Sequence, residues 1–383
     1  MSKFIYFDNN ATTAVTPEVQ KTITKALKSY GNPSSLHFYG VQASEELQKA
    51  RAEVARAINA HPEEIIFTAS GSEGNNLCIR GFAEANKDKG NHIITTAIEH
   101  PSVINACKHL EEQGFSVTYL NVDSDGFVNL DELREAISDK TILVSIMYAN
   151  NEIGTVQNLR EIATICSEHN VSLHTDAVQG FTKLPFDVQT LPVSLATFAG
   201  HKIHAPKGIG FVYRRKEIKL RREIDGGGQE FNLRAGTENL PYILGLAKAV
   251  FLTTEKDVEH MKKLQKYLID KLIQLPNIRL NGTTDLTRRI CTNINISFEN
   301  LEAEKLLNKL SDAGICVSTG SACSSKSTKT SPVLLAIQCP TEYIHGNLRI
   351  SISKYTTKRE VDYLLINLKR VITDENAQKI YLK

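Results

Sequence analysis

The sequence of 383 residues lacks the features that mark several large classes of protein. It contains no run of roughly 18 consecutive apolar residues, the length that predicts a membrane-spanning helix, and no apolar secretory signal at its amino terminus. Its 45 Lys and Arg nearly balance its 43 Asp and Glu, which leaves a formal net charge of only +2. So little excess charge gives no basis for binding nucleic acid or an anionic membrane. We therefore predict a cytoplasmic protein with neither of these partners.

The cysteines lack the patterns of a disulfide framework or a metal site. There are seven of them, an odd number, and no two are spaced as CxxC. Scattered cysteines of this kind indicate reduced thiols. No HExxH or comparable ligand spacing is present either, so that an intrinsic zinc ion or iron–sulfur cluster is not expected. At least one thiol is available for chemistry.

What the chain does contain is enough apolar sequence, 41% of its residues, for one large or two smaller domains. Helical periodicity alternates with short apolar runs between about residues 40 and 215, which predicts an α/β fold with a largely parallel, doubly wound sheet. Ligands of such sheets bind beyond the carboxyl ends of the strands. The expected strands are 65–67, 93–94, 117–120, 142–147, 171–173 and 195–198.

The carboxyl-terminal part has a different pattern. A charged helix is expected from about residue 255 to 275, and 294–298 and 315–317 are expected to be strands. This pattern predicts a smaller α+β domain. Residues 319–331 are small, polar and basic, as is typical of a mobile surface loop, and Cys323 lies among them.

Two segments follow expected strands and could bind a cofactor. Residues 69–76, Ala-Ser-Gly-Ser-Glu-Gly-Asn-Asn, lie between a strand and a helix, where backbone N–H groups and hydroxyls suit a phosphate. Many such turns are, however, merely rich in glycine and serine. Asp176 ends the next-to-last strand, and its carboxylate could keep a ring nitrogen protonated in an electron-sink cofactor. The alternative for Asp176 is a helix cap.

Two further side chains could form covalent bonds. Lys202 directly follows the strand 195–198, and partial desolvation there would lower its pKa and make it a Schiff-base amine. Lys207 competes for this role, and either lysine could simply extend to solvent. Cys323 has two lysines nearby that favour its thiolate. Cys316, by contrast, lies in an apolar segment and is predicted to be buried.

Taken together, these segments resemble the cysteine desulfurases of the NifS and IscS type, which are pyridoxal phosphate (PLP) enzymes of the aminotransferase fold, fold type I. The similarity extends from Phe-Asp-Asn-Asn-Ala-Thr-Thr at 7–13 through Gly-Asn-Pro-Ser-Ser-Leu-His at 31–37 to Arg-Ile-Ser at 349–351. It implies a large PLP-binding domain over residues 15–255, with a mostly parallel seven-stranded sheet between helices. It also implies a smaller α+β domain formed by residues 1–14 and 256–383.

The resemblance implies roles for individual residues as well. Lys202 is implied to bind PLP covalently, His100 to stack on the ring and move protons, and Cys323 to receive the sulfur of L-cysteine as a persulfide while L-alanine leaves. A homodimer is implied, because Thr237 would contact the phosphate in the neighbouring subunit. The other implied contacts are Gly71, Ser72, Asn151, Asp176, Gln179 and His201 with the cofactor, and Arg349 and Asn32 with the substrate.

Two departures from the family pattern bear on these expectations. Ala199 stands where these enzymes often carry a serine, which removes one hydroxyl donor to the phosphate. The carboxyl terminus does not resemble the longer tail that some members use to dock a scaffold protein, although an iron–sulfur scaffold is the expected sulfur acceptor. The alternatives are a selenocysteine lyase or another class V PLP enzyme, which would not need Cys323, and a non-catalytic binding partner in cluster assembly.

Overall fold

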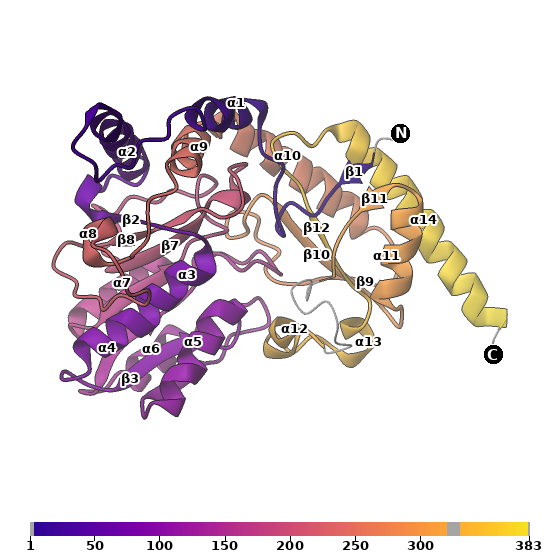
Figure 1. Ribbon diagram of the computed structural model, residues 1–383. Helices are drawn as coiled ribbons and strands as arrows, with labels where there is room; N and C mark the ends of the chain where they lie inside the picture. The colour runs from indigo at the N-terminus through magenta and orange to yellow at the C-terminus, as the bar shows by residue number, and fades with distance from the viewer. Residues whose placement is uncertain (1–3, 320–329, 382–383) are drawn as a thin grey trace.

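The computed structural model describes residues 4–319 and 330–381, with side chains as far as residue 375. A seven-stranded sheet forms the centre of its larger part (Figure 1). Only β8 runs antiparallel to its neighbours, which confirms the predicted α/β fold with a mostly parallel sheet. In spatial order the strands are β2 (Ile65–Thr68), β8 (Gly210–Arg214), β7 (Leu195–Ala199), β6 (Ser172–Asp176), β5 (Thr141–Ser145), β3 (His92–Thr96) and β4 (Ser116–Leu120).

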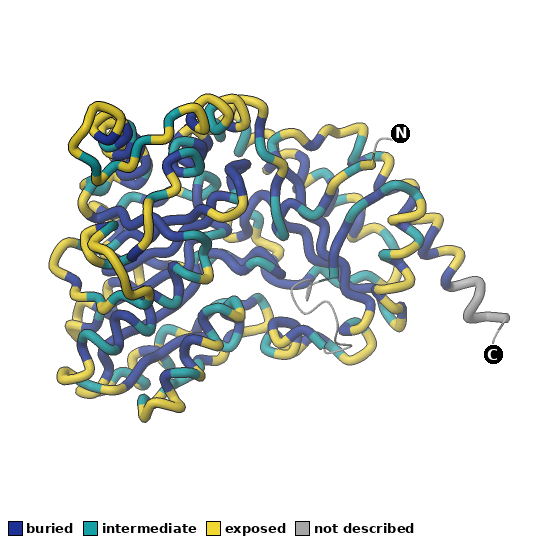
Figure 2. Tube along the Cα trace, viewed as in Figure 1, coloured by how far each residue is buried: buried dark blue, intermediate teal, exposed yellow. Residues whose placement is uncertain are grey.

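Helices cover both faces of this sheet, because successive strand residues point to opposite sides. Ile93 packs in one cluster of buried apolar side chains and Ile94 in another. All of these strands except the edge strand β4 are almost wholly buried (Figure 2), as expected for a parallel sheet between helices. The cluster with Ile94 includes side chains of α2 (Phe38–Arg56), α6 (Leu130–Ala136), α7 (Leu159–Glu168) and α9 (Leu240–Val250); the cluster with Ile93 includes side chains of α4 (Phe82–Asn86) and α5 (Pro101–Glu112).

Several shorter elements complete this part. The helix α3 (Gly71–Asn76) continues through a π-helical turn, Leu77–Gly81, into α4. The helix α1 (Pro17–Ala26) packs on α9. Two 3₁₀ turns, Pro62–Glu64 and Gly200–Lys202, flank strands of the sheet, and α8 (Gln229–Asn232) is a short irregular turn.

The carboxyl-terminal part has its own buried cluster, which Phe7 from the amino terminus joins. Strand β1 (Ile5–Tyr6) pairs with β11 (Ile315–Cys316), so the amino-terminal segment joins the carboxyl-terminal part. The limits 15–255 for a large domain, and 1–14 with 256–383 for a small one, stay a prediction. The other elements are the antiparallel sheet β12 (Asn347–Ser351), β10 (Asn293–Phe298) and β9 (Ile278–Leu280), and the helices α10 (Glu255–Leu272), α11 (Ala303–Asp312), α12 (Pro332–Ala336), α13 (Thr341–Ile344) and α14 (Lys358–Tyr381).

The prediction that Cys316 is buried is wrong. Its strand β11 pairs only with β1 within the described residues, so one edge and one face of this small sheet reach the surface. Cys316 lies opposite Tyr6, which is itself exposed, and is half-buried. The other described cysteines are all buried. Among the described residues, no helix is both long and apolar enough to cross a membrane.

Candidate active site

Polar side chains gather at the carboxyl ends of the parallel strands. Strands β2, β3, β5, β6 and β7 run in the same direction, so the segments that follow them converge at their carboxyl ends. Most of the residues predicted for the site lie on these segments. They are Gly71 and Ser72 after β2, His100 after β3, Asn151 after β5, Asp176 and Gln179 at and after the end of β6, and His201 and Lys202 after β7.

A chain of hydrogen bonds joins Asp176 to His100. The side-chain amide of Asn75 donates to Asp176 Oδ2 at 2.8 Å and lies 2.8 Å from Ser102 Oγ. Ser102 Oγ is in turn 2.8 Å from His100 Nδ1. Asp176 Oδ1 accepts from the backbone N–H of Val178 at 3.0 Å, so that both carboxylate oxygens are held in place. The helix cap that was the alternative for Asp176 is not formed, because a turn rather than a helix follows β6; Asp176 holds this turn and also makes a contact across the site.

The surroundings of His100 favour the uncharged form of its imidazole. Burial lowers the pKa of His100, and the positive charge of Lys202 lowers it further, while Asp176 acts in the opposite direction. The preceding residue, Glu99, is buried, which raises the pKa of its carboxyl group to about 8. Glu99 Oε1 accepts from Thr96 and from the backbone of Met147. The neutral imidazole of His100 can thus serve as a proton acceptor.

The amino-terminal segment brings Lys202 into contact with the rest of the site. Lys202 Nζ donates to the carbonyl oxygens of Asn10 and, at 2.8 Å, Ala11. Gln179 Nε2 donates to the same Asn10 carbonyl at 3.1 Å. The side chain of Asn10 reaches the carbonyl of Asn151 at 3.3 Å. Residues after β5, β6 and β7 are therefore linked through one asparagine.

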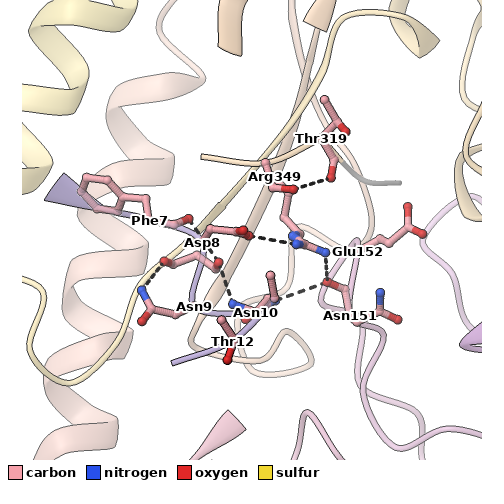
Figure 3. A network of polar contacts seen from close by, with 12 residues as sticks. Phe7, Asp8, Asn9, Asn10, Thr12, Asn151, Glu152, Thr319 and Arg349 are labelled. Atoms are coloured by element: carbon pink, nitrogen blue, oxygen red, sulfur yellow. Dashed lines mark hydrogen bonds and ion pairs between the residues drawn. The ribbon is translucent and has the colours of Figure 1, made fainter. Parts of the chain in front are cut away.

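Arg349, on β12, reaches the same place from the carboxyl-terminal part (Figure 3). Its Nη2 pairs with Asp8 Oδ1 at 3.0 Å, and its Nη1 lies 3.4 Å from the carbonyl oxygen of Asn151. The side chain is almost wholly buried, and its Nε has no hydrogen-bond partner among the described residues. A buried guanidinium with an unsatisfied donor is suited to bind a carboxylate of a small ligand.

The start of α3 has the donors of a phosphate site. The first N–H groups of a helix have no partner within it; here Ser70 Oγ accepts from Glu73, which leaves the amides of Gly71 and Ser72 for a ligand. A Cβ atom at Gly71 would lie 3.4 Å from the Cβ of Ala199, so the end of β7 comes close to this turn. Ala199 offers no hydroxyl to a phosphate at this turn, as expected from the sequence.

His201 lies on the turn after Ala199. Its Nδ1 is 3.3 Å from Thr12 Oγ1. Burial, together with the smaller effect of nearby lysines, lowers the pKa of His201 to about 4, so its imidazole is neutral at physiological pH. A neutral imidazole can donate one hydrogen bond to a phosphate. With the amides at the start of α3, this donor set fits the phosphate of PLP, and Asp176 fits its ring nitrogen.

Three predicted residues are not joined to this cluster. Asn32 is exposed, and its Oδ1 accepts from the backbone of Ser34. Thr237 is also exposed, although Arg234 in the same segment pairs with Glu73 of α3 at 2.9 Å. Cys323 lies outside the described residues.

Several contacts of this site were missed by the analysis of the sequence. Asn75 and Ser102 link Asp176 to His100, Asn10 links Lys202 to Asn151, and Asp8 pairs with Arg349. Asp8 and Asn10 belong to the segment 7–13 and Asn75 to the segment 69–76, both of which were singled out. The sequence contains no signal for the pairing itself, because the partners lie up to 341 positions apart.

The chain is similar to known proteins over nearly its whole length. The family Aminotransferase class-V matches residues 5–364. A cysteine desulfurase IscS of Clostridium botulinum (strain Hall) is 44% identical over 378 residues, 97% of this chain and 95% of that protein. One of Methanosarcina thermophila is 46% identical over 368 residues, 95% of this chain and 91% of that protein. A solved structure of a NifS-like protein is 38% identical, covers 97% of this chain and 99% of its own, and superposes with a TM-score of 0.91.

Proposed function

The chain belongs to the aminotransferase class-V family, and from this membership we infer that it is a PLP-dependent cysteine desulfurase. Its substrate is L-cysteine, its product is L-alanine, and the sulfur remains as a persulfide on a cysteine of the protein. When bound, PLP withdraws electrons from the carbon that carries the substrate's amino group. The protein supplies the binding contacts, the proton transfers and the thiol that accepts the sulfur.

The contacts described above support an assignment of each role. We propose that Lys202 binds PLP covalently and that Asp176, held by Asn75, keeps the ring nitrogen protonated. Gly71, Ser72 and His201 would hold the phosphate, and Asn151 and Gln179 the oxygen side of the ring. Arg349 would bind the substrate carboxylate through its unsatisfied Nε, and His100 would move protons, because its imidazole is neutral.

The observation that carries the desulfurase proposal concerns the two described ends of the segment that contains Cys323. Ser318 forms two backbone hydrogen bonds with Arg349, of 2.7 and 3.1 Å. Ser331 Oγ donates to Glu152 Oε2 at 2.6 Å, and Glu152 directly follows Asn151. Both ends are thus attached beside the proposed substrate site. Cys323 lies between these two ends, five residues after Ser318 and eight before Ser331. This position supports Cys323 as the sulfur acceptor, a thiol that another class V enzyme would not require.

Incubation of the purified protein with L-cysteine tests this function. We expect a visible absorption band from bound PLP and formation of L-alanine without an added keto acid. Alanine would be measured by chromatography, and D-cysteine would serve as the control substrate. Alanine formation that required a keto acid would indicate an aminotransferase, and a protein that could not be loaded with PLP would contradict the proposal altogether.

An exposed apolar surface supports the homodimer. Within residues 30–39, Tyr30, Leu36 and Phe38 are 78%, 96% and 75% exposed, and Tyr39 packs against both Tyr30 and Phe38. Side chains of this size are rarely left together in water on a monomer. We propose that a second copy of the chain covers this surface. Asn32, which lies within it, would then approach the substrate in the partner subunit, and Thr237 the phosphate.

Replacing Leu36 by aspartate is expected to dissociate this dimer, because a desolvated carboxylate at an apolar interface has no partner. Sedimentation should give twice the mass of one chain for the wild type and a single mass for Leu36→Asp. Ile366→Asp is the matched control, since Ile366 is 68% exposed on α14 and lies outside the proposed interface. A wild-type protein that sediments as a monomer would contradict the proposal.

Two further expectations stay predictions of the sequence. One is that the sulfur passes to an iron–sulfur scaffold protein, which labelled sulfur from L-cysteine would reveal on the acceptor. The other is a cytoplasmic location, which cell fractionation would test.

A further inference from the structure

Lys183 has no part in the roles assigned so far, yet its side chain contacts two of the segments that form the site. Its Nζ donates to the carbonyl oxygen of Lys202 at 3.1 Å and to that of Gln179 at 3.2 Å. These carbonyls belong to the segments that follow β7 and β6. Lys183 therefore joins the segment that carries the proposed PLP-binding lysine to the segment that begins with Asp176.

Lys183 also lines a small cavity of about 20 Å³ together with Lys202. The cavity lies where the turn after β6 meets the carboxyl-terminal part, from which Thr292 and Met261 contribute to its lining. Within the described residues no carboxylate pairs with the ammonium group of Lys183, whose acceptors are the two carbonyl oxygens. Burial lowers the pKa of Lys183 to about 8. An interior positive charge without an anionic partner opposes stability, so its presence calls for another explanation.

The residue before Lys183 is held in an unfavourable conformation. Thr182 has a φ of +63°, which a β-branched residue rarely adopts. Its hydroxyl is buried and has no hydrogen-bond partner among the described residues. Strain of this kind persists only where the surrounding structure imposes it, and it is concentrated at functional sites. The turn that positions Lys183 therefore carries a local energetic cost.

We propose that Lys183 is a positioning residue for the desulfurase reaction, which holds the Lys202 segment in place and maintains a positive charge beside the Lys202 amine. This proposal rests on the assignment of Lys202 as the PLP-binding lysine. A neighbouring cation disfavours protonation of a lysine nitrogen and so keeps it available for bonding to a carbonyl carbon. Below about pH 8 Lys183 is charged and the effect is present; above that pH it is lost.

The other titratable groups around Lys183 do not neutralise its charge. Burial lowers the pKa values of His201 and His204 to about 4 and raises that of Cys291 to about 11, so all three are uncharged at neutral pH. The remaining groups are Lys202 and Lys354 in the cavity wall, Asp257 near His204 and Lys354, and Glu259 and Lys262 near Cys291. Neither of these two carboxylates pairs with Lys183 within the described residues.

The test is a spectroscopic pH titration of the resting, PLP-loaded enzyme and of the variants Lys183→Met and Lys183→Gln. Glutamine keeps a hydrogen-bond donor without the charge. We expect the pH at which the visible band changes to rise by about one unit in both variants, because removing a unit charge in the protein interior changes a neighbouring pKa by that order. Lys207→Met is the matched control, since Lys207 is exposed on the same segment and water screens its charge.

Each outcome decides the proposal. A band that titrates at the wild-type pH in both Lys183 variants would overturn it, and so would loss of folding in both, measured by thermal unfolding, because the role of Lys183 would then be structural. A failure of the underlying assignment is recognised separately. If Lys202→Ala still bound PLP covalently, the lysine would have been misassigned, whatever the Lys183 variants showed.

Discussion

Replacing Cys323 by alanine is expected to reduce the formation of L-alanine from L-cysteine by on the order of 10³-fold or more, because removal of an attacking nucleophile has effects of at least that size. The proposal assigns the acceptance of the substrate's sulfur to this thiol. The visible PLP band should be unchanged, since Cys323 is not among the residues proposed to hold the cofactor. Alanine release and protein-bound persulfide would both be measured after incubation with L-cysteine.

Cys316→Ala is the matched control for this experiment. Cys316 is half-buried, seven positions earlier in the chain, and is the most accessible of the described cysteines. It lies on β11 opposite Tyr6, and its thiol forms no hydrogen bond with the site among the described residues. Its replacement should leave alanine formation unchanged. If Cys323→Ala retained full activity, the protein would be a class V PLP enzyme that does not use this thiol, such as a selenocysteine lyase.

Replacing Lys202 by alanine is the second change with a large expected effect. We expect the covalent attachment of PLP to be lost and alanine formation to fall by on the order of 10³-fold or more, as for other residues that form covalent bonds in catalysis. Mass spectrometry after borohydride reduction would show whether PLP remains on the protein. Lys183 would remain in the same cavity of this variant, so the experiment also shows whether a second interior amine can replace Lys202.

Lys207→Ala is the control here, because Lys207 was the competing lysine in the sequence. It is exposed, five positions after Lys202, and should carry no PLP. A reduced peptide with PLP attached to Lys207 in the wild type would reverse the assignment. A protein that binds PLP equally well with either lysine replaced would show that the cofactor is held without a covalent bond.

The sheet could be predicted from the sequence because its signal is local. Each expected strand of 65–67, 93–94, 117–120 and 195–198 is a short apolar run between helical segments and lies within an observed strand, and 171–173 overlaps β6, which begins one residue later. The order of the strands came from the structure alone, because a local apolar run does not specify which strands become neighbours. The turn after β6 shows the limit of such reasoning. Nothing in the sequence reveals the positive φ of Thr182, which packing around the turn imposes.

The sequence by itself determined which chemical groups this protein has: a lysine after an apolar strand, an aspartate at the end of another, and a thiol on a polar loop. These depend on residue type and on neighbours in the chain. The tertiary structure alone decided how the groups meet. Asn75 links Asp176 to Ser102, and Asn10 links Lys202 to Asn151. Lys183 donates to the backbone carbonyl oxygen of Lys202. Hydrogen bonds between residues far apart in the chain depend on the final packing, and local sequence patterns contain no information about them.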